Sequence, residues 1–140
     1  MTRLAGTFPA RLPAFSEIKR LLEEFALSAA LAREDCLRLT LIVEELFTNT
    51  VGHGHGGDSD ATVEVTLEVR SGQIELTYQD SAPPYDPLTA ARHADTTSPL
   101  EQRPVGGLGM LLTVALCREA RYIYVHGRNR VELTLVTSSE

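Results

Sequence analysis

The first part of the chain repeats apolar side chains every three or four residues. This spacing covers residues 14–31, where Pro13 stands at a position that suits the start of a helix. It returns over residues 34–51, and this run is expected to end near Gly52 because further glycines follow at close intervals. The two runs predict two amphipathic helices, each with one face turned toward a core.

Beyond residue 60 the repeat shortens to two residues. Residues 62–70 alternate aliphatic side chains with polar or charged ones, which predicts a half-buried strand. The turn Ser71–Gly72 then leads into a second strand with the same alternation over residues 74–78. A shorter apolar segment, Leu4–Phe8, is a candidate for an additional edge strand.

The second half of the chain begins with a segment that has no repeat of its own. Residues 81–105 are rich in proline and small polar side chains and predict a long loop, of the kind that is usually functional. Residues 108–117 are almost wholly apolar and predict a buried helix. Strands over residues 121–126 and 130–136 are expected to form a hairpin that turns through Gly127–Asn129.

The order of these elements predicts the fold class. Two helices, a hairpin, a loop, a helix and a second hairpin favour an α+β protein, a two-layer α/β sandwich. We expect a mixed, mostly antiparallel sheet with the helices on one face. A length of 140 residues fits a single domain over residues 1–140.

Composition narrows the classes of function. Hydrophobic residues make up 43% and charged residues 23%, and no apolar run approaches the roughly 20 residues that span a bilayer. No signal peptide is visible, so we expect a cytoplasmic protein that has no membrane partner. The formal net charge is −6 and the basic residues are scattered, which argues against direct binding to nucleic acid. Cys36 and Cys117 lack metal-ligand spacing and are predicted to be buried free thiols.

Two familiar ways of holding ATP are excluded by the sequence. The only lysine is Lys19, and no G-x-x-x-x-G-K-[ST] string occurs, which excludes a P-loop. The glycine-loop, lysine and H-R-D signatures of ordinary protein kinases are missing as well. If the chain uses ATP, it must hold the phosphates in another way.

Polar side chains interrupt the apolar face of the second predicted helix. Glu45 and Asn49 are one turn apart, and Asn49 lies about 20° from Ile42 around the helix axis, within the apolar arc. Such groups need partners when buried, so they form either a hydrogen-bonded pair in the core or a Mg²⁺ site beside a general base. Glu44 points elsewhere and is predicted to be a solvated surface residue.

Asp80 is the same kind of exception on a strand. It continues the inward register of Ile74, Leu76 and Tyr78, so its carboxylate should accept a specific donor such as the exocyclic amine of adenine. The alternative is an aspartate that starts a turn and bonds to its own loop backbone.

Two glycine-rich segments complete the candidate chemistry. Val105–Gly109 leads straight into the apolar helix 108–117, so its backbone N–H groups either approach an anion or pack closely. In His53-Gly-His55, two histidines lack the further ligands that zinc needs, which leaves a loop as the better interpretation.

In order along the chain, Glu45-Leu-Phe-Thr-Asn49, Asp80-Ser-Ala-Pro-Pro-Tyr-Asp-Pro87 and Gly106-Gly-Leu-Gly109 resemble the N, G1 and G2 boxes of GHKL ATPases. The resemblance covers nearly the whole chain and implies the Bergerat-type ATP-binding fold. Within the superfamily, the sequence looks most like the anti-sigma-factor serine/threonine kinases. Ala82 departs from the pattern, because glycine is usual there, and its methyl group would lie near the adenine.

The resemblance implies a role for each matching position. Glu45 matches the catalytic base, Asn49 the Mg²⁺ ligand, Asp80 the adenine-recognising aspartate, and His53 a position close to the nucleotide. The segment of residues 88–104 corresponds to a short ATP lid, in which Arg103 is a candidate for reaching the γ-phosphate without a positional match in the family. The residues of the matching phosphate loop are Gly106, Gly107, Leu108 and Gly109. Asp80 and Asn49 are therefore expected to share one cavity.

The resemblance also implies partners. A member of this family would sequester a sigma factor, phosphorylate a STAS-domain anti-anti-sigma protein with MgATP, and form a homodimer. Two other functions remain open from the sequence: a nucleotide-dependent binding switch without significant catalysis, and the catalytic domain of a histidine kinase.

Overall fold

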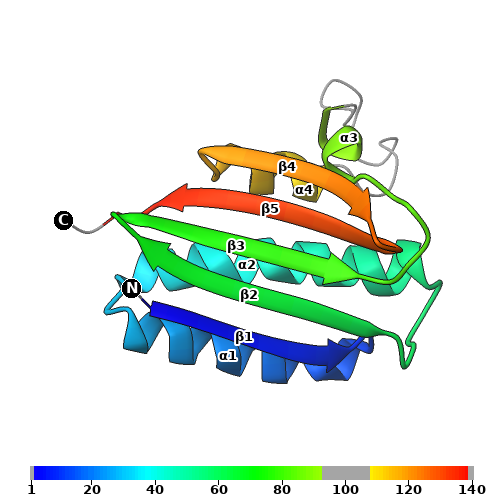
Figure 1. Cartoon of the computed structure of the whole chain (residues 1–140), viewed down its shortest axis with the longest axis horizontal. Helices are drawn as coiled ribbons and strands as arrows, with labels where there is room; N and C mark the ends of the chain where they lie inside the picture. Colours follow the sequence, from blue (N-terminus) through cyan, green and yellow to red (C-terminus); the bar gives the residue numbers. More distant parts are fainter. Residues whose placement is uncertain (1, 93–107, 139–140) are drawn as a thin grey trace.

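A five-stranded sheet forms one layer of the computed structural model, which describes residues 2–92 and 108–138. The strands lie side by side in the order β1-β2-β3-β5-β4, and all four pairings are antiparallel (Figure 1). Their bounds are β1 Thr2–Pro9, β2 Thr62–Arg70, β3 Gln73–Asp80, β4 Glu119–Val125 and β5 Arg128–Val136. The segment Leu4–Phe8 is thus part of edge strand β1, as predicted.

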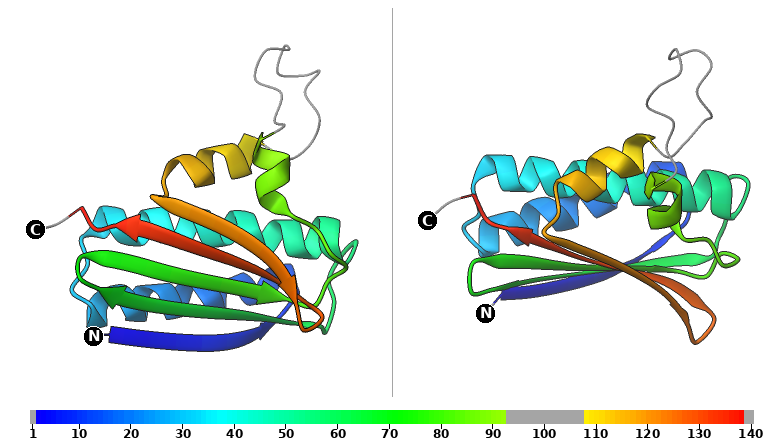
Figure 2. Two further views of the ribbon diagram at one scale, coloured as in Figure 1. Left: turned by 45° about the horizontal axis from the view of Figure 1, so that its top comes forward. Right: turned by 90° about the horizontal axis from the view of Figure 1, so that it is seen from above.

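Helices form the second layer. They are α1 (Phe15–Ser28), α2 (Arg33–Asn49), α3 (Pro87–Arg92) and α4 (Leu108–Ala115), with a 3₁₀ turn η1 at Leu12–Ala14. The turned views show α1, α2 and α4 on one face of the sheet (Figure 2). The predicted α+β class with helices on one face is confirmed.

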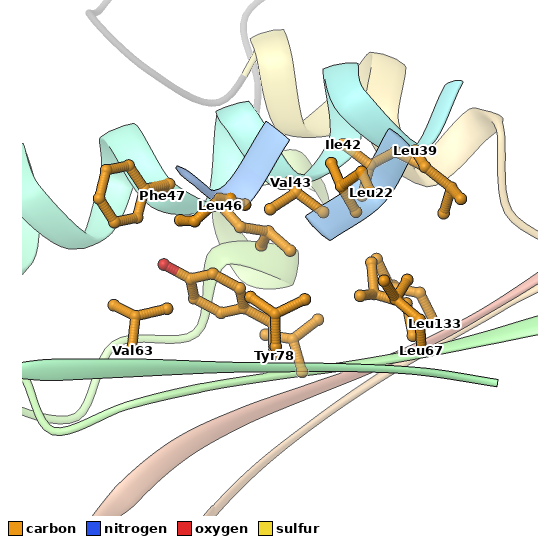
Figure 3. Packing of buried hydrophobic residues seen from close by; sticks show 14 of the residues in the cluster. Leu22, Leu39, Ile42, Val43, Leu46, Phe47, Val63, Leu67, Tyr78 and Leu133 are labelled. Carbon is orange, nitrogen blue, oxygen red and sulfur yellow. The ribbon is translucent and has the colours of Figure 1, made fainter. Parts of the chain in front are cut away.

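The core lies between these layers and follows from the two periodicities. Alternate strand residues such as Leu67, Tyr78 and Leu133 point toward the helices. Helix α2 contributes Ile42 and Leu46 from the face that is turned toward the sheet. Figure 3 shows these two sets of side chains facing one another. The buried apolar residues other than Ala26 and Ala82 belong to one contiguous cluster. That residues 1–140 form a single domain stays a prediction.

Several predicted boundaries were wrong. The last hairpin turns at His126 and Gly127, both with positive φ, so Asn129 lies inside β5 and not in the turn. The segment predicted as a structureless loop contains helix α3. Helix α4 is not fully buried, because Leu112 is 63% exposed.

The cysteines and the membrane prediction have different outcomes. Cys36 and Cys117 are free, as predicted, but only half-buried. No helix in the described part of the chain has the length and apolar character needed to cross a bilayer. A cytoplasmic location stays a prediction.

A buried carboxylate ties the end of the sheet to α2. Asp35, in the first turn of α2, is fully buried and accepts hydrogen bonds from Arg38 Nη2 (2.6 Å) and from the Ser138 N–H (3.1 and 3.2 Å to its two oxygens). Arg38 also donates to the Val136 carbonyl at 2.7 Å. Burial alone would raise the pKa of Asp35, but these hydrogen bonds outweigh it and lower the pKa.

Candidate functional site

A pocket opens where the end of α2 meets the end of β3. Its cavity volume is about 20 Å³, and it is open to solvent. Asp80 and Asn49 both line it, so the predicted shared cavity exists. The complete lining is Leu46, Asn49, Thr50, Gly54, Tyr78, Asp80, Ala82, Tyr85, Pro87, Asn129 and Val131.

Asp80 accepts three hydrogen bonds in the wall of the pocket. It is 7% exposed at the inward-facing last position of β3. Its Oδ2 accepts from Thr50 Oγ1 at 2.7 Å, and its Oδ1 accepts from Asn129 Nδ2 at 2.8 Å and from the Ala82 N–H at 3.1 Å. The turn-forming alternative explains only the bond to Ala82. A carboxylate offers about four lone-pair sites, so these three donors leave one for a ligand.

Thr50 reaches Asp80 from the buried face of α2, where its backbone N–H still bonds to the Leu46 carbonyl as in an α-helix. After Asn49 the chain continues as a π-helical turn, η2 (Thr50–Gly54), and wide turns of this kind are frequent at functional sites. Thr50 Oγ1 lies 2.7 Å from Asp80 Oδ2 and 2.7 Å from Tyr78 Oη. Its single proton is best given to the carboxylate, so the Tyr78 hydroxyl donates to Thr50. Burial raises the pKa of Tyr78, which keeps this hydroxyl a donor.

Asn129 holds the opposite wall. It is 5% exposed, and its Nδ2 lies 2.8 Å from Asp80 Oδ1 and 3.0 Å from the carbonyl oxygens of both Ala82 and Pro83. Its Oδ1 accepts from the Tyr85 N–H at 3.0 Å and from the Tyr122 hydroxyl. One amide therefore connects β5 to the segment that follows β3.

The sequence prediction missed both Thr50 and Asn129. A signal existed for Asn129, since it continues the inward register of Val131, Leu133 and Leu135, as Asp80 does on β3. The misplaced turn hid that register. A signal existed for Thr50 as well, because at 100° per residue it lies about 80° from Ile42, between Leu39 and Val43 on the apolar face of the helix.

Glu45 lies beside the pocket, one turn before Asn49. It is half-buried, and a Cβ added to Gly109 of α4 would overlap its carboxylate. This contact supports close packing as one reason for glycine at position 109. Burial chiefly, and Glu44 next, raise the pKa of Glu45, whereas His53 lowers it. Glu44 is exposed, as predicted.

The side chains of Asn49 and His53 lie at the pocket's edge. Asn49 is half-buried, and its amide makes no hydrogen bond in the described part of the chain. His53 is exposed and stacks on Tyr85, with ring centroids 6.1 Å apart and an interplanar angle of 19°. Among residues 2–92 and 108–138, no group of three or more His, Cys, Asp or Glu side chains is arranged to hold a metal. The Asn49 oxygen is thus a fitting single protein ligand for Mg²⁺, which usually takes its other ligands from phosphates and water.

Part of the predicted site lies outside the described residues. This holds for Arg103, Gly106 and Gly107, and for most of the predicted lid. The first residues of the predicted lid segment belong to helix α3 (Pro87–Arg92). Leu108, from the predicted phosphate loop, is the first residue of α4.

Comparison with known proteins shows the family of the chain. The family model described as "Histidine kinase-like ATPase domain" matches residues 8–135. The chain is 29% identical over 90 residues to an anti-sigma F factor of Shouchella clausii, which covers 64% of this chain and 61% of that protein. It is 27% identical over 119 residues to the serine-protein kinase RsbW of Listeria monocytogenes. This match covers 82% of this chain and 76% of that protein.

A solved structure shares the fold. The crystal structure of the RsbU and RsbW domains of a Mycobacterium tuberculosis protein matches with a TM-score of 0.69 and 20% identity. The match covers all of this chain and 34% of that one.

Proposed function

Since the chain belongs to the histidine kinase-like ATPase domain family, we propose that it binds MgATP and acts as an anti-sigma factor with serine/threonine-protein kinase activity. The observation that carries this proposal is the shared pocket. Two groups line it: a strand carboxylate with one free lone-pair site, and a helix amide that has no hydrogen-bond partner among the described residues. A half-buried carboxylate stands one turn away.

Each part of the pocket suits one part of ATP. The free lone pair of Asp80 would accept a hydrogen bond from the exocyclic amine of adenine, next to the wall formed by Ala82. The Asn49 oxygen would ligate Mg²⁺, which supplies charge neutralisation for the phosphates. We assign the phosphates to the loop of Gly106, Gly107, Leu108 and Gly109, with His53 near the nucleotide and Arg103 near the γ-phosphate.

Glu45 is the proposed catalytic base. When the serine oxygen of a partner protein attacks the γ-phosphorus, a bond forms to that oxygen, the bond to the β–γ bridging oxygen breaks, and ADP leaves. Glu45 would take the proton of the serine hydroxyl. Its raised pKa favours this task, because a base works best when its pKa lies closer to the operating pH.

The proposed partners rest on the names of the relatives for the sigma factor and the kinase activity, and on the sequence resemblance for the STAS-domain protein and the homodimer. One relative is an anti-sigma F factor and another a serine-protein kinase. We therefore propose a sigma factor as the sequestered partner, a STAS-domain anti-anti-sigma protein as the phosphorylated one, and a homodimer as the working form. A clean monomer at micromolar concentration in analytical ultracentrifugation would contradict the homodimer.

The kinase activity is tested by phosphotransfer with Glu45→Gln and the matched control Glu44→Gln. We expect Glu45→Gln to slow phosphoserine formation on the STAS partner by about 100-fold or more while ATP still binds, since general-base catalysis contributes about 10²–10⁴-fold. Glu44→Gln removes an equal charge from an exposed neighbour and should change the rate far less, because Glu44 makes only the smaller contribution to the raised pKa of Glu45.

Two outcomes would contradict the kinase proposal. Equal rates for the wild type and Glu45→Gln, with sigma binding still controlled by ATP, would indicate a binding switch. Acid-labile phosphohistidine on a partner would indicate a histidine-kinase domain.

A further inference from the structure

Two small residues from different elements meet in the wall of the pocket. Gly54 ends the π-helical turn η2, and Ala82 follows β3 by two residues. Ala82 is 2% exposed, and a Cβ added to Gly54 would lie 2.8 Å from the Ala82 Cβ. Separations below 3.0 Å are essentially never seen for real Cβ atoms, so the wall has room for one methyl group at this point and not for two.

The backbone on the Ala82 side is held in place. The Ala82 N–H donates to Asp80 Oδ1 at 3.1 Å, and its carbonyl accepts from Asn129 Nδ2 at 3.0 Å. Both partners are themselves buried. The Ala82 methyl group therefore cannot move aside without breaking the hydrogen bonds that orient Asp80.

The backbone on the Gly54 side is held as well. The His55 N–H donates to the Thr50 carbonyl at 3.0 Å, and the Gly57 N–H donates to the Val51 carbonyl at 2.8 Å. Gly54 itself does not have a positive φ, so its backbone conformation would suit any residue. Its need for glycine comes from the opposing methyl group alone.

We propose that Gly54 and Ala82 are a size-matched pair that sets the width of the base pocket, which makes Gly54 a specificity-determining residue for an adenine nucleotide. The ligand class rests on the proposed function, whereas the packing of the pair does not. Both residues line the pocket that contains Asp80, so a ring that donates an amine to Asp80 must fit against this wall. One methyl group more would close the wall, and one fewer would open a methyl-sized space.

The packing is tested first without a ligand, by urea unfolding of Gly54→Ala, Ala82→Gly and the double variant. We expect Gly54→Ala to lower the folding equilibrium constant about tenfold or more, since overpacking is destabilising. The double variant moves the methyl group across the wall and should recover to within about threefold of Ala82→Gly. Gly52→Ala is the matched control, because a Cβ there meets nothing within 4 Å in the same turn.

The specificity is tested next, by the affinities of the same variants for ATP and for its 2-methyl and N6-methyl analogues. The wild type and Gly52→Ala should bind ATP with equal affinity, whereas the affinity of Gly54→Ala for ATP should be at least tenfold lower. In Ala82→Gly, the affinity for one of the two analogues should rise about tenfold relative to the affinity for ATP, because one methyl group in a fitted pocket changes affinity by about 10–200-fold.

Three results would overturn the inference. Unperturbed stability and affinity of Gly54→Ala would show that the wall gives way. Additive losses in the double variant would show that the two positions are not matched. If the wild type binds no adenine nucleotide, the ligand assignment falls together with the proposed function, and the unfolding data decide the packing of the pair separately.

Discussion

Asn129 offers the sharpest test of how the pocket is built. Its side chain is the hydrogen-bond partner of Asp80 Oδ1, of the Ala82 carbonyl, and of the Tyr85 N–H. Asn129→Ala removes all of these bonds at once and leaves no replacement donor or acceptor at that position.

The magnitude follows from which partners stay buried. Asp80 and Ala82 are buried, whereas Pro83 and Tyr85 are exposed enough for water to reach their backbone groups. Two buried groups thus lose a partner, at about 1–3 kcal/mol each, which gives a destabilisation of about 2–4 kcal/mol after partial relaxation. In a domain of this size that lowers the melting temperature by about 7–14 °C.

The assay is urea unfolding followed by far-UV circular dichroism, because the chain has no tryptophan. Tyr122→Phe is the control: it removes only the hydroxyl that donates to Asn129 Oδ1 and should cost less than about 1.5 kcal/mol. A loss below about 0.5 kcal/mol for Asn129→Ala, in the range of ordinary surface changes, would refute the role assigned to the amide.

Asn129→Asp extends the test to pH. It places a second carboxylate against Asp80, so the pair must hold a proton and its pKa in the folded state rises above the unfolded value. A raised folded pKa means that the folded state binds more protons, so the stability of this variant must fall as pH rises from about 5 to 8. Stability that is independent of pH over this range would show that the two side chains do not meet.

Two further predictions concern the contacts of α2. The pKa of Asp35 is lowered in the folded state. Its contribution to stability is therefore present above its usual pKa of about 3.9 and is lost as pH falls through the lower folded value. In urea unfolding, Asp35→Asn should cost about 1–3 kcal/mol at pH 7 and little at pH 2. A Cβ on Gly109 overlaps the Glu45 carboxylate, so Gly109→Ala should cost about 1–3 kcal/mol of stability. Adding Glu45→Ala should restore most of the loss in melting temperature. No such rescue would contradict the contact.

The fold could largely be predicted from the sequence because it depends on the periodic spacing of hydrophobic residues. The 3.6-residue spacing located α1 and α2, and strict alternation located β2 and β3 with Asp80 on the inward face. The same alternation holds on β5, but the hairpin turn was misplaced, so Asn129 was left out of the strand. Helix α3 was missed because six residues carry too little periodic signal.

The site was readable only where a polar residue broke an apolar pattern. Asp80 and Asn49 do so and line one pocket, although the roles assigned to them stay predictions. Thr50 breaks the apolar face of α2 as well, but its hydrogen bond to Asp80 becomes visible only when the packing of α2 on β3 is known. The fit between Gly54 and Ala82 joins residues 28 positions apart (82 minus 54) and becomes visible only when their distance is known.

The claim that this pocket binds MgATP is tested most directly by the free energy of unfolding with and without the nucleotide. At a concentration 100 times its Kd, MgATP should stabilise the wild type by about 2.7 kcal/mol. Asp80→Asn should lose this increment relative to its own ligand-free value. Its amide oxygen must take the place of Oδ1, which accepts from Asn129 and Ala82, and the amide nitrogen left in the place of Oδ2 cannot accept from the adenine amine. An unchanged wild type, or an equal increment in Asp80→Asn, would contradict the account.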